Sequence, residues 1–303
     1  MIQSIRIHQF RGIRQGEVSD LAPLTVLVGP NGSGKSSVLQ ALHFGASPQP
    51  QIAFQKAHQR QHEELHTDRW LRWRGLASNP AWVEVSSGTG EKRKCEIRPG
   101  SRVSVSSENP STGSEPNWSG EVRWVEPPLA DRDRRLDQLY TWAVEQGRIG
   151  QAEGIIGEVV PELRGLRILT EGNSPVLHVV FENGSVPIAV SGDGVKSLVR
   201  ISLELASLTG GVVLIEEPEL HQHPAAIWQT ARAILVAVRR EVQVVLTTHS
   251  LELIDAILGE GTDDDKRQLA LFRFSLPDGV LHTRRIPGEE ASFLRGEIES
   301  DLR

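Results

Sequence analysis

The stretch LVGPNGSGKSSVLQAL, residues 27–42, combines the residue types that bind phosphate. From Gly29 to Ser36 it matches G-x-x-x-x-G-K-[ST], between an apolar run and an amphipathic segment, as a phosphate-binding loop requires. Glycines let successive backbone N–H groups point at a phosphate, and the following helix adds its positive end. Lys35 is expected to reach the β and γ phosphates, and the Ser36 hydroxyl to face Mg²⁺. The predicted nucleotide-binding residues here are Asn31, Gly32, Ser33, Gly34, Lys35, Ser36 and Ser37.

Two further polar groups follow apolar runs typical of buried parallel strands. Glu216 and Glu217 come directly after GGVVLI, and His249 lies just beyond VQVVL. Because adjacent parallel strands end at the same edge of a sheet, these three side chains are expected to meet at the phosphate site. There Glu216 is predicted to help hold Mg²⁺, Glu217 to orient the attacking water, and His249 to contact the γ-phosphate or that water. Adjacent carboxylates repel each other unless a cation compensates them, which favours a metal site over a solvated acidic loop.

A second anion site is predicted at the start of another helix. The segment SGDGVKSLVRISLELA opens with Ser191, Gly192 and Gly194, whose backbone N–H groups and serine hydroxyl suit a phosphate. A plain serine-capped helix would show the same pattern. The position of this segment ahead of the Glu216–Glu217 pair is what favours the functional interpretation.

A sheet and its flanking helices must carry these groups, and the predicted fold class is α/β. The whole chain is expected to form a single head, with a phosphate-binding core in residues 1–48 and 160–303 and an inserted antiparallel β lobe with helices in 49–159. Hydrophobic periodicity predicts strands over 1–10, 24–29, 81–87, 92–99, 102–107, 121–126, 164–169, 176–181, 185–190, 210–215, 242–246, 269–274 and 279–285. Helices are predicted after the phosphate-binding loop, between 131 and 160, over 195–208, between the last two buried strands, and near the end.

Five segments together resemble the ATP-binding-cassette ATPases: IRIHQFRGI, GPNGSGKSS, SGDGVKSLV, LIEEPELHQHP and TTHS. Within that class they are most similar to the RecF and structural-maintenance-of-chromosomes (SMC) branch, including small AAA-type ATPases of bacterial repair and anti-phage defence. The resemblance implies ATP and Mg²⁺ as cofactors and an ATP-dependent homodimer. In that dimer, Ser191, Gly192 and Gly194 of one subunit close over the γ-phosphate held by the other. It also implies that Arg11, after Phe10 in the FR element, lies near the nucleotide.

The resemblance further implies a switch that hydrolyses ATP and acts in DNA repair or defence. The sequence shows neither a coiled-coil arm nor a nuclease domain, so an effector protein, such as a nuclease, is expected on a separate chain. Two alternatives remain open. One is the ATP-binding subunit of a transporter, although FRG and EEPELHQHP favour the RecF branch. The other is a non-hydrolysing scaffold, suggested by Glu216 where the family usually has aspartate and by the uncertain Q-loop glutamine, for which Gln138 is the candidate.

Charge and composition restrict the possible partners. The formal net charge is −6, so the protein as a whole does not attract nucleic acid or anionic membranes. Residues 69–102, which include DRWLRWRG, nevertheless carry eight Lys or Arg against three Asp or Glu, and this basic lobe is the predicted surface if DNA binds. One cysteine and the absence of a long apolar run predict a cytoplasmic protein without membrane contact.

Three histidines and the cysteine each allow a structural interpretation and a chemical one. His58, His62 and His66 are spaced to share a helix face and could ligate zinc, but a solvated polar helix is favoured because no cysteine or well-placed carboxylate completes the site. Basic neighbours could activate Cys95, but burial in an alternating strand is favoured.

Overall fold

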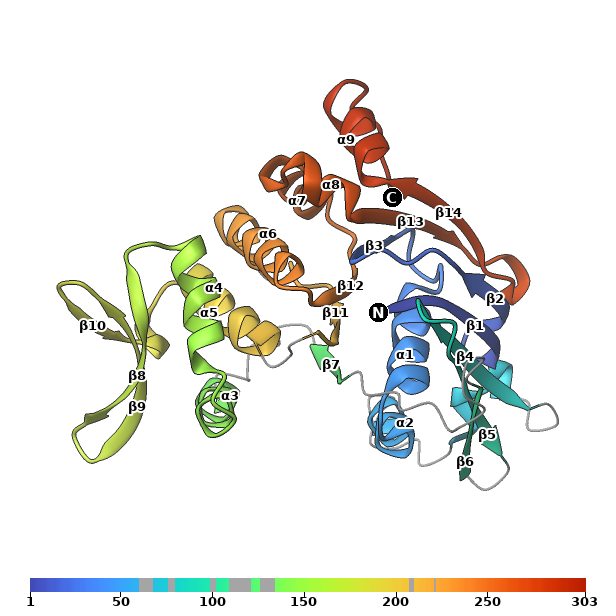
Figure 1. Ribbon diagram of the computed structural model, residues 1–303, viewed down its shortest axis with the longest axis horizontal. Helices are drawn as coiled ribbons and strands as arrows, with labels where there is room; N and C mark the ends of the chain where they lie inside the picture. Colours follow the sequence, from blue (N-terminus) through green and yellow to red (C-terminus); the bar gives the residue numbers. More distant parts are fainter. Residues whose placement is uncertain are drawn as a thin grey trace.

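A six-stranded sheet forms the centre of the molecule (Figure 1). The computed structural model describes residues 1–59, 68–75, 80–98, 102–108, 121–125, 134–206, 210–220 and 222–303. The strand order of the central sheet is β14-β13-β3-β12-β11-β7. Its strands are β3 (Leu24–Val28), β7 (Val122–Val125), β11 (Val212–Glu216), β12 (Gln243–Thr247), β13 (Leu269–Ser275) and β14 (His282–Pro287). All neighbours from β13 to β7 are parallel, and only β14 runs antiparallel to β13. The carboxyl ends of β3, β12 and β11 therefore share one edge.

Helices cover both faces of this sheet, so its inner strands are apolar along their whole length. One face packs against α1 (Lys35–Ala46), and the other packs against α6 (Pro224–Arg239) and α7 (Leu251–Glu260). Along β11, Leu214 belongs to the core on the α1 side, whereas its neighbour Val213 belongs to the core on the α6 side. The two cores hold the sheet edge, and any side chains that extend from it, in a fixed position.

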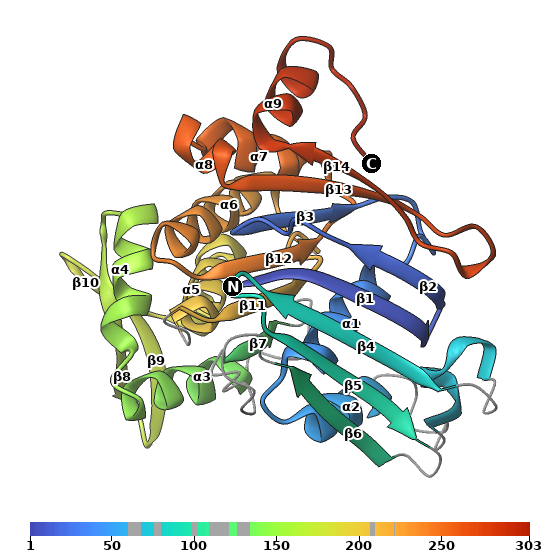
Figure 2. The same ribbon diagram turned by 45° about the vertical axis from the view of Figure 1, so that its right-hand side comes forward.

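A five-stranded antiparallel sheet covers the outer side of α1 (Figure 2). Its order is β2-β1-β4-β5-β6, with β1 (Ile2–Phe10), β2 (Ile13–Val18), β4 (Ala81–Ser87), β5 (Lys92–Arg98) and β6 (Arg102–Glu108). The expected β lobe is thus an extension of the N-terminal hairpin, because β4 pairs with β1. Along each central strand of this sheet, buried residues such as Val83 and Cys95 alternate with more exposed polar ones, since only one face packs on α1.

The fourth strand predicted in that lobe lies in the other sheet. β7 pairs in parallel with β11, so Val122–Val125 form the edge of the central sheet. Alternation in VRWV indicates one buried face, and an edge strand of a parallel sheet satisfies this as well as a hairpin strand does. Sequence periodicity therefore could not tell the two sheets apart.

A helical lobe lies beside the central sheet, at the left in Figure 1. It contains α3 (Arg134–Glu145), α4 (Ile149–Val159), α5 (Asp193–Ala206) and a three-stranded sheet of β8 (Leu163–Glu171), β9 (Ser174–Phe181) and β10 (Gly184–Pro187). The strand expected over 185–190 ends early, because Pro187 has no N–H for a ladder and a 3₁₀ turn follows at Ile188–Val190. Packing of α5 against α6 joins this lobe to the core.

The remaining elements are short. They are α2 (Pro50–Gln59), α8 (Asp263–Arg267), α9 (Gly288–Gly296) and 3₁₀ turns at Asp68–Leu71, Trp73–Gly75 and Pro277–Gly279. Over the described ranges the longest helix is α6, with 16 residues, so no helix there forms a coiled-coil arm. None of the described helices is both long enough and apolar enough to span a bilayer.

Candidate functional site

The phosphate-binding loop joins β3 to α1 through backbone conformations that glycine adopts without strain. Gly34, the residue before α1, has φ 96°. At Gly29, φ is 142°, and an added Cβ would lie only 2.7 Å from the carbonyl oxygen of Phe274. A side chain at either position would strain the loop, and at Gly29 it would also collide with the backbone of β13. Both fixed glycines of the sequence pattern are therefore required by the local geometry.

The first turn of α1 is open to an anion. Gly34 provides no side-chain cap, and no acidic residue lies in the first turn, so the positive end of the helix faces the loop. Lys35 is buried, with 4% of its surface exposed. Its Nζ donates to the carbonyl oxygens of Gly29 at 2.8 Å and Pro30 at 3.2 Å. Burial lowers the pKa of Lys35, and two nearby carboxylates oppose that shift.

The other loop residues differ in exposure. Asn31 and Gly32 are exposed, whereas Ser36 and Ser37 are half-buried at the start of α1. Ser33 is buried, and its Oγ has no hydrogen-bond partner within the protein. Its backbone N–H already donates within the loop at 3.2 Å. The Ser33 hydroxyl lies beneath the loop, where a Cβ added to Gly29 would come within 2.8 Å of it.

The turn between β1 and β2 lies beside the phosphate-binding loop. A Cβ added to Gly12 would lie 3.9 Å from Oγ of Ser37. Arg11 belongs to the same turn, with φ 52°, and its backbone N–H donates to the carbonyl oxygen of Leu71 at 3.0 Å. The turn that carries Arg11 is thus next to the first turn of α1, although it precedes the phosphate-binding loop in the sequence and is separated from it by β2 and β3.

The acidic pair lies at the end of β11. Glu216 is the last residue of the strand and shares a strand face with Leu214, which packs on the α1 side. Its carboxylate is therefore on the side of the sheet that carries Ser36. Glu217 follows with φ 43°, in the left-handed region. Its N–H donates to the carbonyl oxygen of Thr247 at 3.1 Å and to the hydroxyl of the same residue at 3.2 Å, so the end of β12 fixes this unusual backbone conformation.

His249 contacts Glu217, as the ends of adjacent parallel strands predict. Nε2 of the imidazole lies 3.3 Å from Oε1 of the carboxylate. Burial lowers the pKa of His249, the positive charge of Lys35 lowers it further, and Glu217 opposes them. Burial and the charge of Lys35 thus favour the neutral imidazole, whereas Glu217 favours the protonated one.

A third carboxylate, which the sequence reasoning missed, connects the two loops. Oε1 of Glu219 accepts hydrogen bonds from Oγ1 of Thr248 at 2.5 Å and from the backbone N–H of His249 at 3.1 Å. Burial raises the pKa of Glu219, and its hydrogen bonds oppose that shift. The segment EEPE contains a signal for it, because a third glutamate lies two positions beyond the acidic pair, in a stretch without hydrophobic periodicity.

The predicted second anion site lies at the start of α5. Ser191 is half-buried, and its Oγ donates to the carbonyl oxygen of Pro187 at 3.2 Å. Gly192 is exposed, and an added Cβ there would meet no atom within 4 Å. A Cβ at Gly194 would lie 3.2 Å from Oε1 of Gln229 on α6. Packing within the protomer therefore favours a small residue in place of Gly194, whereas an added Cβ at Gly192 would meet no steric obstacle.

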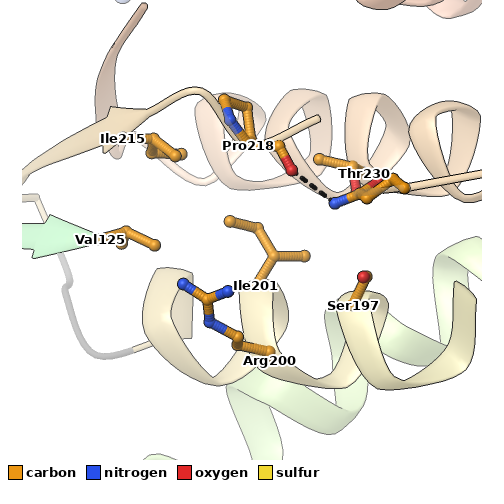
Figure 3. Close-up of a pocket in the computed structure, with 8 residues that line it drawn as sticks. Val125, Ser197, Arg200, Ile201, Ile215, Pro218 and Thr230 are labelled. Carbon is orange, nitrogen blue, oxygen red and sulfur yellow. Dashed lines mark hydrogen bonds between the residues drawn. The ribbon is translucent and has the colours of Figure 1, made fainter. Parts of the chain in front are cut away.

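A pocket lies between α5 and the loop that follows Glu217 (Figure 3). Nε2 of Gln222 donates to the carbonyl oxygen of Pro218 at 2.6 Å, and Oε1 of Gln222 accepts from Thr230 at 3.0 Å. Helix α6 thereby holds the loop on the side opposite β12. The pocket is lined by Val125, Ser197, Arg200, Ile201, Ile215, Pro218, Gln222 and Thr230.

The residues present suit a nucleotide with Mg²⁺ better than a metal bound by protein alone. No group of three or more His, Cys, Asp or Glu side chains within the described ranges is arranged to hold a metal. Mg²⁺ is typically bound by one or two protein side chains together with substrate phosphates. The Ser36 hydroxyl and the Glu216 carboxylate are oxygen ligands of that kind, and the uncapped first turn of α1 suits the phosphates.

The structure shows which residues of the basic lobe are buried and where Cys95 lies. Arg93 is 6% exposed and donates to Ala46 at the carboxyl end of α1, at 3.5 Å, and Arg72 is 4% exposed. Among the basic-lobe cations whose side chains the structure describes, Arg72 and Arg93 are therefore internal. Cys95 is fully buried, and burial raises the pKa of its thiol to about 11, so the structural interpretation holds.

The predictions for the Q-loop glutamine and for the three histidines concern residues that lie wholly or partly outside the described ranges, or beside them. Gln138 is exposed on α3, and residues 126–133, which follow β7, lie outside the described ranges, so the Q-loop stays unassigned. Of the three histidines considered for zinc, His62 and His66 also lie outside the described residues, as does the side chain of His58.

A comparison with protein families matches residues 1–68 and 139–254 to the AAA ATPase domain, which is more than half of the chain and includes the phosphate-binding loop, the acidic pair and His249. The chain belongs to this family. It is an ATPase, and the residues that the match covers are those that meet at the sheet edge. A comparison with curated protein sequences gives no match.

Solved structures similar to this AAA ATPase are SMC head domains. The SmcHead bound to the C-winged helix domain of ScpA aligns with a TM-score of 0.63 at 15% identity, over 96% of this chain and 99% of that one. The SMC head with an extended coiled coil from Pyrococcus furiosus, bound to the C-terminal domain of ScpA, gives 0.61 at 13% identity, over 99% of both chains. The SMC head domain from Thermotoga maritima gives 0.58 at 14%, over 94% and 98%. The AAA ATPase therefore has the fold of an ABC-type head of the RecF/SMC-like branch.

Proposed function

We propose that this ATPase is a molecular switch, in which ATP joins two heads and hydrolysis releases them, and that residues 1–303 act as one head. The observation that carries the proposal is the meeting of three groups at one sheet edge. The uncapped start of α1, the acidic pair after β11 and His249 after β12 all lie there, and Glu217 and His249 are in contact at 3.3 Å.

Each group has a role that its surroundings support. Lys35, held inside the loop by backbone carbonyls, neutralises charge on the β and γ phosphates. Ser36 and Glu216 would hold Mg²⁺, which when bound adds positive charge beside the phosphate oxygens. The Glu217 carboxylate accepts a hydrogen bond from the attacking water and orients it. His249 lies against the Glu217 carboxylate, at 3.3 Å, and responds to the γ-phosphate.

The start of α5 is proposed to complete the site of a second protomer. Helix α5 packs against α6, on the face of the central sheet opposite to α1, and the two helices lie apart in Figure 1. The start of α5 is therefore proposed to act on a phosphate-binding loop other than its own. Gly192 is exposed without any packing demand for glycine, as expected where another backbone or a phosphate approaches closely. Asn31 and Gly32 of the phosphate-binding loop are exposed, as a contact with a second protomer requires.

We expect Ser191→Arg to abolish ATP-dependent dimerisation while each monomer still binds ATP. The large cation would occupy the approach of the partner's γ-phosphate, but it lies on a different element from the loop that binds ATP. Size-exclusion chromatography with ATP and Mg²⁺ measures dimerisation, and titration of a fluorescent ATP analogue measures monomer affinity. Ser185→Arg, exposed on β10 in the same lobe, is the matched control and should dimerise normally. A large fall in monomer affinity for Ser191→Arg would contradict the trans assignment.

The switch is proposed to control a separate effector in bacterial DNA repair or anti-phage defence. Two of the similar SMC heads were solved with domains of a partner protein, ScpA, so partner binding is compatible with this head fold. We place any DNA contact on the outer face of the antiparallel sheet. There Lys92 is exposed, and Lys94 lies over the ring of Trp82 at 4.3 Å, which places two cations on this face for phosphate contacts.

We expect the double substitution Lys92→Glu and Lys94→Glu to weaken DNA binding and to lower the salt slope of log affinity by up to about 2 units, because each lost phosphate contact removes about 0.9. Arg93 is excluded from the test, since reversing it would place a carboxylate at the carboxyl end of α1 and destabilise the fold. Fluorescence anisotropy at several salt concentrations measures both quantities. Arg284→Glu with Arg285→Glu, exposed on β14, changes the net charge equally and should leave binding unaltered. Equal losses in the two variants would remove this surface as the DNA site.

A further inference from the structure

Glu219 makes two hydrogen bonds with one carboxylate oxygen, and both donors belong to the loop after β12. The donors are the hydroxyl of Thr248 at 2.5 Å and the backbone N–H of His249 at 3.1 Å. Glu219 itself lies in the loop after β11, so a single side chain connects the two loops that carry Glu217 and His249. Hydrogen bonds to a carboxylate are stronger than those between neutral groups.

The first consequence concerns the backbone of His249. Its N–H is held by Glu219, and the hydroxyl of Thr248 also accepts from the N–H of Ser250 at 2.9 Å, so the start of α7 is fixed through the same residue. The imidazole then reaches Glu217 at 3.3 Å. A shift of the loop by one ångström would break that contact, because hydrogen bonds weaken steeply with distance and angle.

The second consequence concerns the carboxylate itself. Oε2 of Glu219 is buried and has no hydrogen-bond partner within the protein, which is costly for a carboxylate. A neutral side chain with an acceptor oxygen, such as glutamine, could accept the same two hydrogen bonds from Thr248 and His249 at a smaller desolvation cost. The negative charge does act on the site, since it opposes the lowering of the Lys35 pKa by burial. An unsatisfied buried oxygen at this position is expected where geometry near a reacting group matters more than stability.

From these contacts we propose that Glu219 is a positioning residue for ATP hydrolysis, which holds His249 against Glu217 through Oε1. This inference rests on the proposed function, because it assigns Glu219 an effect only through the roles of Glu217 and His249. No contact between Glu219 and the nucleotide is required. Other contacts hold the loop after β11 independently of Glu219. The N–H of Glu217 donates to the carbonyl and hydroxyl oxygens of Thr247, and Gln222 links the loop to Thr230 on α6.

The test compares Glu219→Ala with Glu219→Gln. Alanine removes the acceptor, and kcat for ATP should fall about tenfold or more, as for a lost buried charged hydrogen bond, with KM unchanged within about twofold. Glutamine keeps an oxygen for both donors and should restore kcat to within about threefold of the wild type. Thr248→Val, which removes one donor but leaves the His249 N–H bond, should have an intermediate effect. Thermal unfolding of each variant confirms that it is folded. A glutamine variant as slow as the alanine variant would overturn the proposed role of Oε1.

A double-mutant cycle with His249→Ala separates this inference from the proposed function. If Glu219 acts through His249, then Glu219→Ala should change the single-turnover rate less than about twofold once His249 is alanine. A full tenfold loss in that background would mean that Glu219 acts independently and would overturn the inference alone. A His249→Ala enzyme that hydrolyses ATP at the wild-type rate would instead contradict the role of His249 in the proposed function, together with the inference that depends on it.

Discussion

Glu217→Gln is expected to bind ATP normally, to hydrolyse it about 100- to 1,000-fold more slowly, and to accumulate as a dimer. The amide has the size of the carboxylate but cannot accept a proton or orient water through a negative charge, and general-base catalysis contributes rate factors of this order. The substitution leaves the backbone bond from residue 217 to Thr247 in place, so the left-handed turn at φ 43° is retained. Phosphate release measures the rate, and size-exclusion chromatography with ATP and Mg²⁺ measures the dimer.

The matched control for this variant is Glu297→Gln, an exposed glutamate after α9. It should hydrolyse ATP and elute as the wild type does. The role of Glu217 would be wrong if Glu217→Gln turned over ATP at the wild-type rate. If it bound ATP without hydrolysis and yet stayed monomeric, the catalytic role would stand and the ATP-dependent dimer would be contradicted.

Lys35→Ala is expected to lower the affinity for ATP by about 100-fold, because a hydrogen bond from a charged group contributes about 1.5–3 kcal/mol. The side chain is 4% exposed and its ammonium lies inside the loop, so no other lysine can take its place. Removing it also leaves the carbonyl oxygens of Gly29 and Pro30 without this donor, which should lower the midpoint of thermal unfolding slightly. Titration of a fluorescent ATP analogue measures the affinity.

Lys92→Ala, which removes an exposed lysine from β5, is the control for the general effect of lost charge and should bind ATP as the wild type does. Wild-type affinity in Lys35→Ala would show that the loop does not bind the phosphates as proposed. A loss accompanied by a cooperative unfolding transition near that of the wild type attributes the effect to binding and not to misfolding.

The sequence alone determined the local geometry of the site. The pattern from Gly29 to Ser36 requires positive φ at two glycines and a helix start without a competing cap, and the structure has both. The rule that parallel strands end at one edge placed His249 against Glu217, and the two are in contact. These predictions succeeded because each depends on short-range geometry or on the direction of a buried strand, both of which are encoded in consecutive residues.

Only the tertiary structure decided which distant segments share a sheet and which charges are internal. Alternation predicted a strand over 121–126 but not its pairing with β11, since a half-buried strand looks alike in either sheet. Arg93 stands between two lysines in a basic strand, yet the two-residue period turns it inward to the carboxyl end of α1. Glu219 lies in a loop, where no periodicity predicts direction, and its partners Thr248 and His249 are about thirty residues away. Such a contact arises only when β11 and β12 pair in register, because strand pairing across the chain, not local sequence, brings the two loops together.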